Sequence, residues 1–249
     1  MASLFSSSPL HVNAVVVAAG QGERMGSPLP KPFLPLAGAP LVIHTVRSLA
    51  CSRRIAKVIL VVAAERETLC RDMVEAHGPF SIPVRLVHGG LERQDSVRLG
   101  LAALDAACEV VVIHDAARPF ITSEIIDQSI VVAAEVGGAL VAVQVRDTIK
   151  RVEQDGMVRE TISRQNLWLA QTPQTFRASL IREAHERALA AGVKVTDDAA
   201  LVEWVGGRIK IVPGDPLNFK ITTPGDLHLA EAILKGELGA GKTDFSSHP

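Results

Sequence analysis

The chain has 249 residues, of which 47% are hydrophobic, and its formal net charge at pH 7 is -1. This length and apolar content indicate one large folded domain with a sizeable core. The near-zero net charge argues against nucleic-acid or membrane-surface binding over the whole molecule, so an anion site would have to be local. No apolar run approaches the roughly 18 residues of a membrane span.

The two ends of the chain differ in composition from the part between them. Residues 1–12 are expected to be a disordered leader and residues 236–249 a flexible tail, which leaves residues 13–235 as the folded domain. Three cysteines, Cys51, Cys70 and Cys108, fall in apolar or helical stretches without paired spacing. We interpret them as buried thiols in a reducing compartment, which predicts a cytoplasmic location.

The first strong signal is the stretch AVVVAAGQGERMGSPLPK, residues 14–31. Val15–Ala18 predicts a buried strand, and Gly20 and Gly22 after it let a ligand approach the backbone. Arg24 and Lys31 follow on a segment that contains two prolines. Backbone N–H groups and two cations at the end of one strand suit a polyanion such as a nucleoside triphosphate.

Two other interpretations of this loop remain open. A dinucleotide-binding turn requires G-x-G-x-x-G at the start of a helix and an acid about 20 residues later. Here the spacing of Gly20, Gly22 and Gly26 is one residue too long, and the first acid after the next strand is Glu65. A glycine-rich connection that binds nothing is the second alternative, although it leaves the two cations without a role.

Strands alternate with helices over the first 145 residues. We expect strands at 57–63, 84–87, 109–114 and 138–145, and helices at 40–50, 65–77, 94–107 and 122–136. This alternation predicts an α/β fold with a single doubly wound, mostly parallel, Rossmann-like sheet. Since ligands bind at the carboxyl ends of such strands, the loops 20–31, 90–96 and 115–118 should meet in one site.

The alternation breaks between residues 146 and 172. Two alternating segments, 148–153 and 157–162, flank Gln154-Asp155-Gly156, which predicts a β-hairpin. A projecting two-stranded arm is marginal in water, so we expect it to pack against a second copy of the chain in a homodimer. Beyond it we expect a helix at 179–191, a helix capped by residues 196–198 and a strand at 208–212. Residues 218–222, a strand-like context for Lys220, then precede a last helix that starts near Thr223.

Several polar residues have both a functional and a structural interpretation. Asp115, at the end of a strand, could hold a divalent metal on phosphates, or it could cap a helix or pair with Arg118. Ser96 could contact a base or sugar, or cap its helix. Lys220 could be catalytic or an ordinary edge lysine. Histidine and cysteine spacings for a transition-metal site and the G-x-S-x-G motif of serine hydrolases are absent from the sequence.

Seven motifs in order resemble the 2-C-methyl-D-erythritol 4-phosphate cytidylyltransferase family, from about Asn13 to Leu234. They are AAGQGERMG with PKPF, GGLERQDSV, HDAARPF, VRDTIKR, SRQNLWLAQTPQTF, TDDAALVE and NFKITTPGDL. The resemblance implies a nucleotidyltransferase fold with a dimerisation arm. It also implies transfer of a cytidylyl group from CTP to 2-C-methyl-D-erythritol 4-phosphate, with Mg²⁺ as cofactor and without nucleic-acid or membrane partners.

The resemblance also assigns roles to individual residues. The nucleotide site comprises Ala18, Ala19, Gly20, Gly22, Gly90, Arg93, Ser96 and Ala116. Arg24 and Lys31 act on the triphosphate and, with Lys220, are the catalytic residues. Asp115 holds Mg²⁺ and contacts the substrate. The acceptor is bound by Arg118, Thr196 and Lys220 of one subunit and by Thr148, Arg164 and Thr172 of the other.

One residue departs from the family pattern: Leu91 stands where the family usually has an acid, so a contact made by that side chain is in doubt. Two alternative functions remain. The acceptor could be another polyol phosphate such as ribitol 5-phosphate, because the nucleotide half of the site would look the same. The chain could also be a nucleotide-binding module without turnover.

Overall fold

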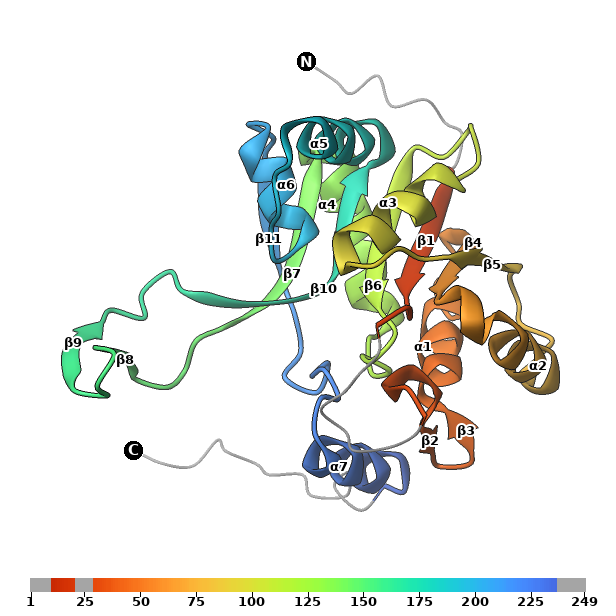
Figure 1. Ribbon diagram of the computed structural model, residues 1–249, viewed down its shortest axis with the longest axis horizontal. Helices are drawn as coiled ribbons and strands as arrows, with labels where there is room; N and C mark the ends of the chain where they lie inside the picture. The colour runs from red at the N-terminus through yellow and green to blue at the C-terminus, as the bar shows by residue number, and fades with distance from the viewer. Residues whose placement is uncertain (1–9, 21–28, 237–249) are drawn as a thin grey trace.

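The computed structural model describes residues 10–20 and 29–236, and its centre is a seven-stranded sheet (Figure 1). The strand order is β11-β7-β10-β6-β1-β4-β5. The strands are β1 (Val12–Val17), β4 (Ile55–Val62), β5 (Val84–His88), β6 (Val110–Asp115), β7 (Gly138–Gln144), β10 (Trp168–Arg177) and β11 (Ile209–Pro213). The strand expected at Val15–Ala18 is present but begins three residues earlier, and the other strands predicted up to residue 145 and at 208–212 are confirmed within two residues.

Strand β10 is the antiparallel member of this sheet. It pairs antiparallel with both β6 and β7, whereas the other strand pairs are parallel. Sequence analysis missed β10, in which Pro173 interrupts the pattern and the register with β7 shifts between Ala170 and Gln174. The carboxyl ends of β1, β4, β5 and β6 therefore lie at one edge, and the predicted mostly parallel sheet is confirmed.

Helices cover both faces of the sheet. Helices α1 (Leu41–Ala50), α2 (Glu67–His77) and α4 (Ser123–Val136) pack on the face that contains Val16. Helices α3 (Arg93–Ala102), α5 (Ala178–Ala191) and α6 (Asp198–Trp204) pack on the face that contains Val15. Successive strand residues point to opposite faces, so these buried β-branched runs are apolar on both sides.

Shorter elements complete the body near the carboxyl edge. Helix α7 (Pro224–Leu234) begins at a Thr223–Asp226 capping box and contributes Ala230 to a small core with Leu36 and Ile221. The remaining elements are η2 (Lys31–Phe33), β2 (Pro35–Leu36), β3 (Ala39–Pro40) and η3 (Ala64–Arg66). Within the described ranges, no helix combines the length and apolarity needed to cross a bilayer.

Four expectations from the sequence need correction. The helix predicted at 94–107 ends at Ala102, because the next turn places Asp105 against Lys57. Residues 218–222 do not form a strand, and Ile221 instead donates a backbone hydrogen bond to Ala117. Strand β1 begins at Val12, inside the range assigned to the leader. Of the cysteines, Cys70 and Cys108 are buried as expected, but Cys51 is exposed.

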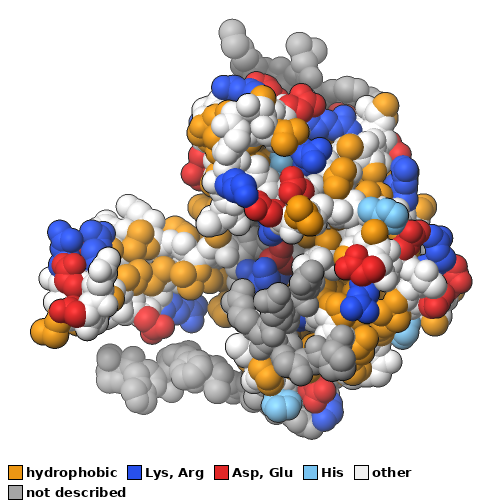
Figure 2. All heavy atoms as spheres, viewed as in Figure 1, with side chains coloured by type: hydrophobic (Ala, Val, Ile, Leu, Met, Phe, Trp, Pro, Cys, Tyr) orange, Lys and Arg blue, Asp and Glu red, His pale blue; other side chains and the backbone are white. Residues whose placement is uncertain are grey.

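The predicted hairpin is confirmed and extends away from the body (Figure 1). Strands β8 (Ile149–Val152) and β9 (Val158–Ile162) pair antiparallel and form the tip of this arm, which comprises residues 146–167. Met157 is 68% exposed and Val158 60% exposed, and apolar side chains run along the arm in Figure 2. Packing of the arm on a second copy of the chain stays a prediction. The disorder expected for the leader and the flexibility expected for the tail also stay predictions, because residues 1–9 and 237–249 lie outside the described residues.

Candidate active site

Backbone hydrogen bonds hold the loops that follow β1, β5 and β6 side by side. Ala18 N lies 2.8 Å from Val61 O, Gly89 N lies 2.8 Å from Val62 O, and Ala116 N lies 3.2 Å from Val17 O. The described residues of these loops form a cavity of about 250 Å³ at the carboxyl edge of the sheet. Its lining is Val17, Ala19, Gly20, Lys31, Pro32, Gly90, Leu91, Glu92, Arg93, Ser96, Asp115, Ala116, Ala117 and Lys220.

Two consecutive glycines precede α3 at one side of this pocket, where the backbone packs closely against its neighbours. A Cβ atom on Gly89 would lie 2.6 Å from the Ala19 side chain, and one on Gly90 would lie 2.4 Å from the Asp95 side chain. Neither position can accept a larger residue without a shift of its neighbours. The Ser96 hydroxyl accepts a hydrogen bond from the Gly90 N–H at 3.1 Å and thereby helps to order this loop. It does not cap α3, where Glu92 occupies the N-cap position.

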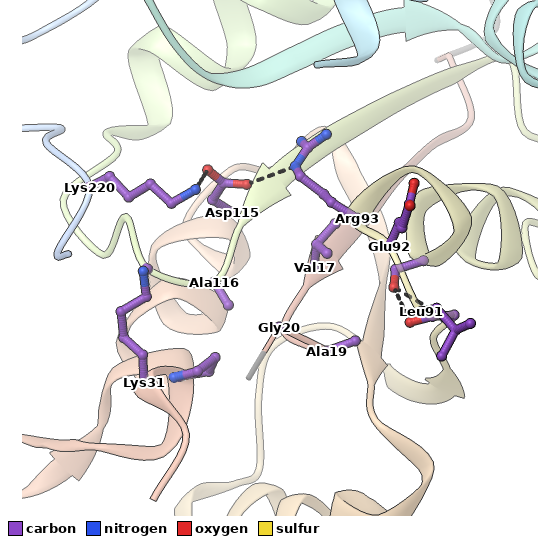
Figure 3. Close-up of a pocket in the computed structure, with 14 residues that line it drawn as sticks. Val17, Ala19, Gly20, Lys31, Leu91, Glu92, Arg93, Asp115, Ala116 and Lys220 are labelled. Atoms are coloured by element: carbon purple, nitrogen blue, oxygen red, sulfur yellow. Dashed lines mark hydrogen bonds and ion pairs between the residues drawn. The ribbon is translucent and has the colours of Figure 1, made fainter. Parts of the chain in front are cut away.

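Three cations pair with the Asp115 carboxylate, and two of them, Lys220 and Arg93, are seen in Figure 3. Lys220 Nζ lies 2.9 Å from its Oδ2, Arg93 Nε lies 3.4 Å from its Oδ1, and Arg118 Nε lies 3.8 Å from its Oδ2. Burial alone would raise the pKa of Asp115, but Lys220 and Arg93 hold this pKa well below its usual range. Asp115 is therefore a carboxylate and a poor proton acceptor. Of the two structural interpretations considered for it, the structure shows the ion pair and not the helix cap.

Arg93 and Arg118 are themselves held in place by further contacts. Arg93 Nη1 lies 2.8 Å from Oδ2 of the buried Asp198, and Arg118 Nη1 donates to the Asn218 carbonyl at 2.7 Å. Burial alone would lower the pKa of Arg93, but Asp198 and Asp115 raise it. Fixed guanidinium groups of this kind stabilise anions without reorganising when the ligand arrives.

The other residues for which a nucleotide contact is predicted lie around the same cavity where the structure describes them. Lys31, in η2, reaches the cavity from the wall opposite Arg93, while Ala19, Gly20 and Ala116 lie between them (Figure 3). Ala18 is buried behind the cavity wall. Gly22 and Arg24, for which a nucleotide contact is expected, lie outside the described residues.

The predicted acceptor residues are more dispersed. Thr148 and Arg164 are exposed on the arm, and Thr196 is exposed on the segment before α6, so none of the three lines the cavity of its own chain. Thr172 is 4% exposed, and its hydroxyl accepts a hydrogen bond from the Asp115 N–H at 3.0 Å. Because this hydroxyl is engaged inside its own chain, a substrate contact across a subunit interface stays a prediction.

Sequence reasoning missed some residues of the pocket. Val17, Pro32, Glu92 and Ala117 line it as neighbours of predicted residues, and Leu91 is fully exposed at its rim. Asp198 was interpreted as part of a helix cap, whereas Asp197 is the N-cap of α6 and Asp198 pairs with Arg93. The sequence offered one sign of this second role: two adjacent acids stand at the start of one helix, and only one of them is needed as the cap.

We tested whether these residues suit Mg²⁺. In the part of the chain that the structure describes, no group of three or more His, Cys, Asp or Glu side chains could hold a metal ion. Asp115 offers one carboxylate at the cavity wall, and Mg²⁺ in nucleotide sites is commonly held by one or two carboxylates together with phosphate oxygens. The site therefore fits a Mg²⁺ ion that arrives on a phosphate ligand and not one held by the protein alone.

The arrangement suits charge stabilisation rather than proton transfer. Lys31, Arg93 and Lys220 converge on one cavity, and the described lining residues include no histidine or cysteine. The two acids among them are both paired, Asp115 with the cations above and Glu92 with Lys194 at 2.5 Å. Such a site can bind a polyanion and stabilise negative charge that develops during a reaction.

Comparisons with known proteins identify the family to which this chain is similar. The family model described as 2-C-methyl-D-erythritol 4-phosphate cytidylyltransferase matches residues 12–236. Curated proteins with that name include one from Geotalea uraniireducens, 46% identical over 228 residues that cover 91% of this chain and 97% of that protein. Another, from Bacillus pumilus, is 46% identical and covers 92% and 100%.

Solved structures show the same similarity. The 4-diphosphocytidyl-2C-methyl-D-erythritol synthase of Anaerococcus prevotii superposes with a TM-score of 0.80 at 31% identity, over 92% of this chain and 100% of that chain. The 2-C-methyl-D-erythritol 4-phosphate cytidylyltransferase of Thermus thermophilus gives a TM-score of 0.76 at 32% identity, over 91% and 100%.

Proposed function

The chain belongs to the 2-C-methyl-D-erythritol 4-phosphate cytidylyltransferase family, and from this premise we propose that its reaction takes place in the pocket at the carboxyl ends of β1, β5 and β6. The enzyme transfers a cytidylyl group from CTP to 2-C-methyl-D-erythritol 4-phosphate. The products are 4-diphosphocytidyl-2-C-methyl-D-erythritol and pyrophosphate, in non-mevalonate isoprenoid precursor biosynthesis. The observation that carries the assignment of the site is the convergence of Lys31, Arg93 and Lys220 on the cavity that contains Asp115.

The nucleophile requires little activation. A phosphate monoester has a second pKa of about 6 and is mostly a dianion at neutral pH. One of its oxygens forms a bond to the α-phosphorus of CTP while the bond from that phosphorus to the bridging oxygen breaks, and the electron pair leaves with pyrophosphate. No proton has to be removed, which agrees with the cation-paired Asp115.

Repulsion between the two anionic substrates raises the barrier of the reaction, and cationic side chains lower this barrier. Lys31 and Arg24 stabilise the triphosphate and the leaving pyrophosphate, and Lys220 draws the acceptor phosphate towards the α-phosphorus. The backbone of Gly90, the side chain of Ser96 and Arg93 contact the cytosine and ribose, beside Ala18, Ala19, Gly20, Gly22 and Ala116. Fixed positive charge in a partly buried pocket is worth more than the same charge in water.

Mg²⁺ is part of the proposal. Asp115 would hold it together with phosphate oxygens, and when bound it supplies charge neutralisation and orientation of the phosphates. Lys220 lies 2.9 Å from the same carboxylate, so an ion held there would share Asp115 with this ammonium group.

The acceptor site is proposed to span two subunits. Arg118, Lys220 and Thr196 belong to the body of one subunit, and Thr148 and Arg164 lie on the arm, which projects away from that body (Figure 1). The exposed apolar side chains of the arm support its packing on a second copy. A cytoplasmic location, as expected from the unpaired cysteines, completes the proposal.

A panel of four nucleoside triphosphates against two acceptors tests the function. Pyrophosphate release is followed with Mg²⁺ and either 2-C-methyl-D-erythritol 4-phosphate or ribitol 5-phosphate. We expect release with CTP and the first acceptor and much lower kcat/KM in the other combinations. A higher kcat/KM with ribitol 5-phosphate would reassign the acceptor, and release in none of the eight combinations would reduce the chain to a nucleotide-binding module.

A further inference from the structure

Three segments meet at one buried point near the pocket, and two of them carry groups to which the proposed function gives a role. The turn after β6 carries Asp115 and Arg118, and the segment before α7 carries Lys220. The third segment is Gln171–Thr172 of β10, at the place where the pairing of β10 with β7 shifts register. Gln171 and Thr172 are both at least nine-tenths buried.

A chain of hydrogen bonds joins Thr172 to both ends of the turn. His114 Nε2 lies 3.0 Å from Arg118 O, and His114 Nδ1 lies 3.0 Å from the Thr172 hydroxyl. That hydroxyl also accepts the Asp115 N–H at 3.0 Å. Arg118 N donates to Asp115 O at 3.1 Å and closes the turn.

Donor and acceptor roles in this chain are fully determined. A carbonyl oxygen can only accept, so the hydrogen of the neutral His114 ring must lie on Nε2 and point at Arg118. Nδ1 is then an acceptor, and the Thr172 hydroxyl must donate to it. The Thr172 oxygen keeps lone pairs for the Asp115 N–H. His114 is fully buried, which disfavours the charged imidazolium and agrees with the neutral ring that this arrangement requires.

Thr172 also holds the segment that carries Lys220, through its backbone carbonyl. Asn218 is fully buried, and its Nδ2 donates to Thr172 O at 2.9 Å and to Gln171 Oε1 at 3.1 Å. Its own carbonyl accepts the Arg118 Nη1 bond at 2.7 Å. Gln171 Nε2 in turn donates to Asp215 O at 2.9 Å. Two residues of β10 therefore fix both segments relative to each other.

We propose that Thr172 is a positioning residue: its hydroxyl, through His114, sets the Asp115–Arg118 turn, and its carbonyl, through Asn218, sets the segment of Lys220. The inference rests on the proposed function for the roles of Asp115, Arg118 and Lys220. Thr172 also lies at the root of the arm, which enters β10 at Trp168. The segment Gln171–Thr172 therefore sets two features: the direction in which the arm leaves the body and the positions of Arg118 and Lys220.

Matched substitutions at Thr172 separate the hydroxyl from the shape of the side chain. Thr172→Val keeps the shape and removes the hydroxyl, whereas Thr172→Ser keeps the hydroxyl. Loss of one buried hydrogen-bonding group predicts that Thr172→Val lowers kcat/KM by about 10-fold or more. Thr172→Ser should recover most of the activity. Thr175→Val is the control, because it removes another buried β10 hydroxyl, 2.8 Å from Ser129, and should leave kcat/KM unchanged.

A second readout uses the ligand-free protein and does not depend on the identity of the substrates. In NMR spectra, Thr172→Val should move the Nδ1 resonance of His114 and speed hydrogen exchange of the Asp115 amide, and neither change should occur in Thr172→Ser or Thr175→Val. Wild-type kinetics together with an unchanged Nδ1 resonance in Thr172→Val would overturn the proposal. So would equal losses in Thr172→Ser and Thr172→Val, because the hydroxyl would then be irrelevant.

Thermal unfolding establishes that each variant is folded before it is assayed. If Thr172→Val does not fold, Asn218→Asp provides the test, because it replaces the two N–H donors with an oxygen at nearly constant shape. We expect this variant to raise the KM for the acceptor by about 10-fold, since the Lys220 segment loses its tie to Thr172. An unchanged KM would contradict the proposal. A wild-type enzyme that is inactive on the nucleotide panel would instead refute the proposed function and leave the NMR test in force.

Discussion

The ammonium group of Lys220 lies 2.9 Å from Oδ2 of Asp115, and the two residues come from segments that are far apart along the chain (Figure 3). Lys220 belongs to the segment before α7, which also packs Ile221 against the core, and Asp115 ends β6. A lysine in this position can exchange its carboxylate partner for a phosphate of similar charge. The ion pair therefore prepares the site for an anionic acceptor.

Replacement of Lys220 by glutamine should affect the acceptor more than the nucleotide. Loss of one preorganised charge donor predicts a fall of about 10² in kcat/KM for the acceptor, with a smaller effect on the KM for CTP. Steady-state assays of pyrophosphate release measure both constants. Lys210→Gln removes an exposed lysine of β11 and serves as the control. A normal kcat/KM in Lys220→Gln would exclude Lys220 from the reaction.

Lys31 and Arg24 should matter most for turnover. If they stabilise the triphosphate and the leaving pyrophosphate, Lys31→Ala and Arg24→Ala should each lower kcat by about 10² or more. The measurement is pyrophosphate release at saturating CTP and acceptor, with CTP binding measured separately by calorimetry. A near-normal kcat in either variant would refute the role of that residue.

Asp105 should affect stability without affecting catalysis. It accepts hydrogen bonds from Lys57 at 2.7 Å and Asn13 at 3.2 Å, near the amino-terminal ends of β4 and β1 and far from the pocket. The Lys57 hydrogen bond, with those of Asn13 and His11, lowers the pKa of Asp105 to about 2. Because the folded-state pKa lies below the unfolded one, the stabilisation is complete above about pH 4 and is lost as pH falls towards about 2.

Asp105→Asn is therefore expected to lower the free energy of unfolding at pH 7. The difference from the wild type should narrow once the pH falls below about 4. Urea unfolding at several pH values provides the measurement, and kcat/KM at pH 7 should stay at the wild-type level. A stability difference that is the same at pH 7 and pH 3 would show that the charge of Asp105 is not responsible.

Mixing two inactive variants should restore activity if the acceptor site is shared between subunits. In a heterodimer of Lys220→Gln and Arg164→Ala, one of the two sites contains both wild-type residues. Random pairing then predicts about a quarter of the wild-type activity. Lys220→Gln mixed with Asp115→Asn is the control, because both residues belong to the same half of the site. No recovery in the first mixture, with dimers demonstrated by sedimentation, would place Arg164 outside the shared site.

Much of the sheet could be predicted from the sequence because its strands are buried on both faces. Runs such as Lys57–Ala63 leave few alternatives to a parallel strand, and the ligand edge follows from the topology. The loops 90–96 and 115–118 meet there as predicted. Strand β10 escaped prediction because Pro173 and the register shift at Ala170–Gln174 break its alternation, although long-range pairing with β6 and β7 stabilises it.

The candidate site was predictable as a set of residues but not as a network. The sequence marks Asp115, Arg93 and Lys220 individually, whereas their distances depend on the meeting of three segments that are far apart along the chain. Thr172 shows the limit most clearly, since motif position predicts a substrate contact and the structure places its hydroxyl between Asp115 and His114. Asp198 could not be distinguished from the neighbouring cap residue until its contact with Arg93 was seen.

The central claim is that the cations of this edge bring two anionic substrates together. A crystal structure of the enzyme with CTP and Mg²⁺ tests it most directly. We predict a triphosphate in contact with Lys31 and Arg24, with its α-phosphorus facing Lys220 and the metal on Asp115. A triphosphate bound away from Lys31 and Arg24 would contradict the account.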